Sequence, residues 1–150
     1  MQTLPKNIDM APSKPQVWRA SVRGYEVDLL GIVNNACYMN YLDQARIEAL
    51  AAFGIDWAEF HEQGFDIVLF ESNLKWQSSL KNNQPFRIET SFKREGKLKI
   101  KCQQIIIRED GSTVLAADNT IVCIRAENQR PCFPKELGVA LGFLSGLRHQ

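Results

Sequence analysis

The residue types that could do chemistry gather in one short stretch, residues 25–46, which reads YEVDLLGIVNNACYMNYLDQAR. Asp28 offers a carboxylate on a predicted loop and precedes Gly31, and Asn34 and Asn35 then offer N-cap chemistry for a long helix. The amino end of a helix exposes unpaired N–H groups and carries partial positive charge. It can therefore polarise a carbonyl and hold the oxyanion that develops in acyl transfer, with Asp28 facing the same carbon.

Each of these residues also has a purely structural interpretation. Aspartate is common before turns, so Asp28 could simply shape its loop. Asn34 and Asn35 could simply cap the helix, a role that is compatible with building an oxyanion site. Tyr38 is expected to form core or pocket wall.

The sequence lacks the motifs that other classes of enzyme require. The sequence has no G-x-S-x-G elbow and no glycine-rich phosphate loop. His61 and His149 have no plausible nucleophile within a recognisable motif. A hydratase or dehydratase would need a second proton-transfer group beside the carboxylate, and Asn35 and its neighbours include no histidine.

Size and composition point to one soluble globular domain. The chain has 150 residues, a formal net charge of +1 and no apolar run near the ~20 residues of a membrane span, so we expect no nucleic-acid coat and no transmembrane helix. Its four cysteines form no C-x-x-C pair, which predicts no metal site, no disulfide framework and a reducing cytoplasm. We expect residues 1–16 to be a flexible extension and residues 17–150 to be the domain.

Hydrophobic periodicity predicts one strand, one long helix and then a run of strands. The expected strands cover 17–25, 65–76, 86–93, 97–108 and 113–125, and the expected helices cover 34–53, 56–64 and 135–144. The long helix has an apolar stripe at helical spacing formed by Tyr38, Leu42, Ala45, Ala49 and Phe53. The strand over 65–76 has one predicted face formed by Val68, Phe70, Ser72, Leu74 and Trp76. Pro131 and Pro134 are expected to end the sheet.

Short connections between the later strands predict an antiparallel meander, and long strands must twist and curl. The long helix is the only element able to fill the concave face of such a sheet. The predicted fold class is α+β, a curved antiparallel sheet wrapped around one central helix. Open sheet edges favour a homodimer or homotetramer.

The stretch over 25–46 resembles the signature of the 4-hydroxybenzoyl-CoA thioesterase family, whose fold is the hotdog fold. That signature has an aspartate, two variable residues, a glycine, a short apolar link, a polar pair and a helix with spaced aromatics. The matching positions, in order, are Asp28, Gly31, Asn34, Asn35, Tyr38, Tyr41 and Arg46. The similarity in strand and turn layout extends over about residues 17–137.

The resemblance implies hydrolysis of an acyl-CoA thioester, with Asp28 as nucleophile or as general base towards water. The oxyanion donor would be a backbone N–H near Asn35, Ala36 or Cys37, with Gly31 in the same loop. Some family members have a histidine or tyrosine where Asn35 stands, and Asn35 can donate a hydrogen bond but cannot shuttle a proton. No cofactor is implied, because coenzyme A is part of the substrate.

Basic residues cluster about a predicted turn at Gly96. Coenzyme A carries a 3′-phosphate and a diphosphate, and family members commonly place cations here, so the resemblance assigns phosphate binding to Lys93, Arg94 and Lys97, with Tyr38 also near the substrate. The alternative is an ordinary solvated strand face.

Two further functional hypotheses stay open. In an acyl-carrier-protein thioesterase, the basic turn would meet an acidic protein instead of a nucleotide. A non-catalytic acyl-thioester binding protein of the same fold would bind without releasing thiol.

Overall fold

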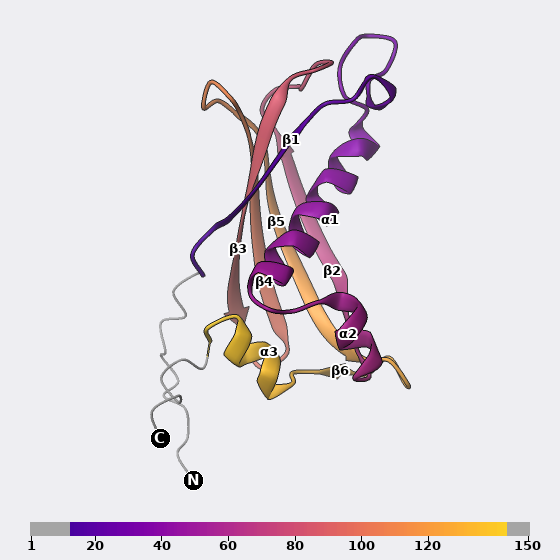
Figure 1. The fold of residues 1–150 in the computed structure, drawn as a ribbon, viewed down its shortest axis with the longest axis vertical. Coiled ribbons are helices and arrows are strands. Elements are labelled where there is room, and N and C mark those ends of the chain that lie inside the picture. Colours follow the sequence, from indigo (N-terminus) through magenta and orange to yellow (C-terminus); the bar gives the residue numbers. More distant parts are fainter. Residues whose placement is uncertain (1–12, 144–150) are drawn as a thin grey trace.

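The computed structural model describes residues 13–143, so residues 1–12 and 144–150 lie outside it. Its elements in chain order are β1 (Gln16–Ser21), η1 (Gly24–Glu26), α1 (Asn35–Ala52), α2 (Trp57–Glu62), β2 (Phe65–Trp76), β3 (Pro85–Glu95), β4 (Lys99–Arg108), β5 (Thr113–Arg125), β6 (Pro131–Cys132) and α3 (Lys135–Ala140). The long strands form a curved antiparallel sheet with α1 lying across its concave face (Figure 1). This is the α+β arrangement that the sequence predicts.

The strand order corrects the predicted meander. The order across the sheet is β1-β3-β4-β5-β2, so β2 pairs with β5 instead of with its successor β3. The connection over residues 77–84 therefore crosses the end of the sheet, and it buries Leu80 completely. As a result β2 pairs on one side only along its twelve residues and forms an edge of the sheet.

A bulge in β2 corrects the predicted strand face. The pairing register with β5 shifts between Leu69 and Glu71, which leaves Phe70 without an opposite residue. A bulge reverses the alternation of side chains beyond it. Trp76 and Leu74 therefore share a face with Leu69, whereas Val68 lies on the other face.

Three predicted boundaries also differ from the structure. β1 ends at Ser21, and Gly24–Glu26 form a 3₁₀ turn instead of more strand. Pro131 does not end the sheet, because β6 still pairs with the end of β5. α3 spans Lys135–Ala140, shorter than the helix expected over 135–144, although residue 144 is outside the described range.

The long helix α1 begins and ends where the sequence predicts. Asn34 caps it by accepting a hydrogen bond from the Ala36 N–H at 2.9 Å, and Gly54 follows its end with a φ of +87°. The predicted stripe is buried from Tyr38 to Ala49, while Phe53 is half-buried. The stripe also includes a charged residue, Arg46, which is only 7% exposed.

Some classes of feature are lacking within residues 13–143. No helix there is long and apolar enough to cross a membrane. No group of three histidine, cysteine or acidic residues there could hold a metal ion. The four cysteines are free thiols, with the Sγ atoms of Cys123 and Cys132 separated by 3.7 Å across β5 and β6.

Candidate active site

Asp28 opens a tight turn on the loop before α1. Its backbone N–H donates to the Ile32 carbonyl at 2.8 Å, and its carbonyl accepts from the Gly31 N–H at 3.0 Å. Its Oδ1 accepts from the Leu30 N–H at 2.8 Å. Gly31 has a φ of +76°, a conformation that favours glycine, so the turn requires it. Asp28 is exposed, and its turn uses only one of the two carboxylate oxygens, Oδ1.

The amino end of α1 has one N–H group left for a ligand. The Ala36 N–H donates to Asn34 Oδ1, and the Cys37 N–H donates to the Asn34 carbonyl at 2.9 Å. The predicted donors Ala36 and Cys37 are therefore occupied by the cap. Within residues 13–143 the Asn35 N–H has no acceptor, so Asn35 is the remaining candidate.

Backbone pairing holds the Asp28 turn beside the helix tip. Val27 and Val33 form an antiparallel bridge, and the Asn34 N–H donates to the Glu26 carbonyl at 2.9 Å. The turn thus closes a small hairpin whose second arm leads directly into α1. The hairpin is fastened to the crossing connection by the Val33 N–H, which donates to the Leu80 carbonyl at 2.9 Å. The turn that carries Asp28 is therefore adjacent to the amino end of α1.

The loop also exposes large apolar side chains. Leu29 and Leu30, directly after Asp28, are 106% and 81% exposed, and Tyr25 is 77% exposed. Surface leucines are ordinary one at a time, but neighbouring exposed apolar groups mark contact surfaces. The turn that carries the carboxylate is therefore well suited to meeting an apolar group.

Tyr38, predicted near the substrate, is 1% exposed. Its hydroxyl accepts a hydrogen bond from the Leu80 N–H at 3.0 Å, and its ring packs edge-on against Trp76. Burial raises the pKa of Tyr38 above its ordinary value, which keeps the hydroxyl neutral. Its evident task is to hold the crossing connection against α1.

The predicted phosphate-binding residues do not lie near Asp28 within one chain. Ser21 pairs with Pro85, which places the Asp28 loop at the Pro85 end of β3. The basic turn follows Glu95 at the other end of β3, so the two are separated by ten residues of strand, roughly 33 Å. Figure 1 shows the tip of α1 and the arrowhead of β3 at opposite ends of the molecule.

One of the basic residues of this turn, Arg94, is engaged in contacts within the chain. Arg94 donates to the carbonyls of Gly96 and Lys97 and lies 3.9 Å from the ring centre of Phe133. Burial lowers the pKa of Arg94 from its ordinary value. Lys93 and Lys97 remain exposed.

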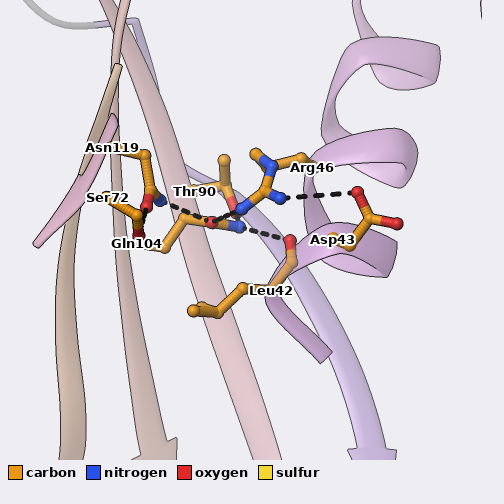
Figure 2. Close-up of polar contacts among 7 residues, drawn as sticks. All are labelled: Leu42, Asp43, Arg46, Ser72, Thr90, Gln104 and Asn119. Atoms are coloured by element: carbon orange, nitrogen blue, oxygen red, sulfur yellow. Dashed lines mark hydrogen bonds and ion pairs between the residues drawn. The ribbon is translucent and has the colours of Figure 1, made fainter. Parts of the chain in front are cut away.

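A buried polar network at the middle of α1 was not predicted (Figure 2). Arg46 Nη1 donates to Gln104 Oε1 at 3.0 Å, and Gln104 Nε2 donates to the Leu42 carbonyl at 2.9 Å. Asn119 also donates to Gln104, and Ser72 Oγ donates to Asn119 Oδ1 at 2.6 Å. The network ties α1 to β4, β5 and β2. An arginine inside an apolar helical stripe, and a glutamine between Cys102 and Ile106 on an inward strand face, were the available signals.

Comparisons with known proteins agree with this architecture. Residues 22–141 match the family model described as the thioesterase-like superfamily. Over 111 residues the chain is 31% identical to the long-chain acyl-CoA thioesterase FadM of Escherichia coli, covering 73% of this chain and 83% of that protein. It is 30% identical over 102 residues to the chloroplastic acyl-acyl carrier protein thioesterase ATL2 of Arabidopsis thaliana, covering 67% of this chain and 54% of that protein.

Solved structures show the same fold. The DHNA-CoA thioesterase of Staphylococcus aureus superposes with a TM-score of 0.80 at 16% identity, covering 90% of this chain and 93% of that one.

Proposed function

The chain belongs to the thioesterase-like superfamily and is a thioester hydrolase, and we propose that its substrate is an acyl-coenzyme A on which Asp28 acts. The single observation that supports this proposal is the hairpin that joins the Asp28 turn directly to the amino end of α1. A thioester needs a base or nucleophile and an oxyanion donor, but little acid assistance, because the thiolate leaves readily.

The proposed reaction uses these two groups on one carbon. Asp28 either attacks the carbonyl carbon, giving an anhydride that water then opens, or removes a proton from an attacking water. The oxygen of the carbonyl becomes negative and is held by the Asn35 N–H and the dipole of α1. The carbon–sulfur bond then breaks, and coenzyme A leaves as the thiolate.

The basic turn fits this proposal only with a second copy of the chain. Lys93 and Lys97 lie too far from Asp28 in one chain to hold the phosphates of the same substrate. β2 is an edge strand with Val68 and Phe70 38% and 60% exposed, so we propose that two copies associate there as a homodimer. The phosphates would then be held by the basic turn of the other copy.

An acyl-carrier-protein thioesterase is the second candidate, favoured by the likeness to ATL2. Lys93 and Lys97 would then face an acidic carrier surface. The third hypothesis, a non-catalytic binding protein, is not retained, because the family match supports a thioester hydrolase.

Thiol release decides among these candidates. Matched acyl groups are presented on coenzyme A and on carrier protein, and kcat/KM is measured for each. We expect faster release from coenzyme A, and loss of most release in Asp28→Asn with an unchanged circular-dichroism spectrum. Faster release from the carrier would select the second candidate, and equal turnover in Asp28→Asn would remove Asp28 from the mechanism.

A further inference from the structure

A cavity of about 220 Å³ lies beside α1, well away from the Asp28 loop. Ile47 and Leu50 of α1, Phe60 of α2 and Leu69 of β2 contribute to its walls, and Trp57 lies at the start of α2. Most of the lining is aliphatic or aromatic. The cavity is therefore suited to an apolar occupant.

The charged groups in the lining already have partners on the chain. Arg46 donates to Gln104 and lies 3.4 Å from Asp43 (Figure 2). Asp66 lies 2.6 Å from Nδ1 of His61. Because each charged side chain in the lining already has a polar partner on the chain, the apolar side chains determine which occupant the cavity favours.

An apolar track leads from the tip of α1 towards this cavity. The inward face of the edge strand β2 is only partly covered. On that face Trp76 is 44% exposed and contacts Tyr38, Leu74 is half-buried, and Leu69 is 40% exposed. The track begins near the helix tip at Trp76 and ends in the cavity at Leu69. Ser72 lies between Leu74 and Leu69 on this face, and its hydroxyl is already bonded to Asn119.

We propose that the track and cavity hold a long, unbranched acyl chain whose thioester lies at Asp28; this inference rests on the proposed function. From Asn35 to Ile47 α1 rises about 18 Å, at roughly 1.5 Å per residue. A palmitoyl chain has about fifteen carbon–carbon bonds of roughly 1.5 Å, so in its zigzag form it spans roughly 19 Å. A compact aromatic or short acyl group bound at Asp28 would not reach the cavity.

The test measures how binding depends on chain length. Octyl- and hexadecyl-coenzyme A are thioethers that cannot be hydrolysed, and their Kd values are measured by calorimetry below their micelle concentrations. Ile47→Trp fills the cavity, and Ile105→Trp is the matched control, because Ile105 is 40% exposed on the outer face of the sheet. Circular dichroism checks that each variant is folded.

We expect the wild type and Ile105→Trp to bind the hexadecyl ligand at least about tenfold more tightly than the octyl ligand, since burial of each methylene adds affinity. In Ile47→Trp this ratio falls to about one to two, while octyl binding is unchanged. Equal ratios in Ile47→Trp and wild type, or no chain-length preference in wild type, would overturn the proposal.

A second variant covers the case in which Ile47→Trp does not fold. Trp57 is 65% exposed, so Trp57→Ala removes one wall of the cavity without disturbing the core. The hexadecyl preference is expected to fall several-fold, and an unchanged preference would contradict the cavity. Because binding is measured without turnover, a wild type that prefers hexadecyl-coenzyme A but releases no thiol would refute the proposed hydrolysis alone.

Discussion

The amino-terminal tip of α1 and its middle turn, around Arg46, hold their polar groups by different kinds of contact. At the tip, Asp28 and Asn34 bond to neighbours two residues away and face solvent. At the middle turn, Arg46 reaches Gln104, 58 residues further along the chain, inside the core. The two parts of the helix therefore differ in what their polar groups can do. The exposed tip carries polar groups that a ligand can reach, and the buried turn fixes where the helix lies on the sheet.

The largest expected effect concerns the tip and activity. Asp28→Asn should lower kcat about 100-fold or more, because it removes a base or nucleophile while keeping the shape of the side chain. Asp110 is a matched control, since its Oδ1 also accepts the N–H two residues on at 2.8 Å, in the β4–β5 turn at the same end of the sheet. Asp110→Asn should keep wild-type kcat. Similar losses in both variants would mean that Asp28 only shapes its turn.

Substitutions at the middle turn should lower the stability of the protein more than its activity. Gln104→Leu leaves the buried guanidinium of Arg46 without its main acceptor, which should cost about 2–4 kcal/mol of unfolding free energy. Gln103→Leu, at an exposed position on the same strand, serves as the control and should cost under about 1 kcal/mol. Urea unfolding measures both. A Gln104→Leu variant that is as stable as the wild type but has lost activity would contradict the structural role given to this contact.

A smaller effect is expected from the basic turn, which lies beyond both regions. Reversing Lys93 and Lys97 to glutamate should raise KM for acyl-coenzyme A about three- to tenfold at low salt, with little change in kcat. The control is the substitution Lys75→Glu, a charge reversal on β2. Removing the 3′-phosphate from the substrate should raise KM less in the variant than in the wild type. If it raises KM equally in both proteins, the turn does not bind that phosphate.

The smallest expected effect tests the cap at the tip. Asn34→Ala removes the acceptor of the Ala36 N–H and should cost about 1 kcal/mol. Asn40→Ala, an exposed position within α1, should be neutral or slightly stabilising, because alanine favours helix. Thermal unfolding compares the two. A neutral Asn34→Ala would show that the cap does not hold the tip in place.

The contrast between the two regions also explains what could be predicted from the sequence. The Asp28 turn, the Asn34 cap and the Gly54 stop are local, so residue types at short spacing indicate them. The Arg46–Gln104 contact, the pairing of β2 with β5 and the bulge at Phe70 depend on residues far apart in the sequence. Short-range patterns show Arg46 and Gln104 on apolar faces but do not show that they pair, and no short-range pattern indicates the strand pairing or the bulge. The distance between Asp28 and the basic turn has the same origin, since only the strand register places them at opposite ends.

The most direct test of the central claim is a crystal structure with a ketone analogue of an acyl-coenzyme A, in which a methylene replaces the sulfur. The Asn35 nitrogen should lie within about 3.2 Å of the ketone oxygen. A carboxylate oxygen of Asp28 should lie about 3–3.5 Å from the carbonyl carbon, directly or through one ordered water. A ketone bound elsewhere, with no contact to either group, would contradict the account.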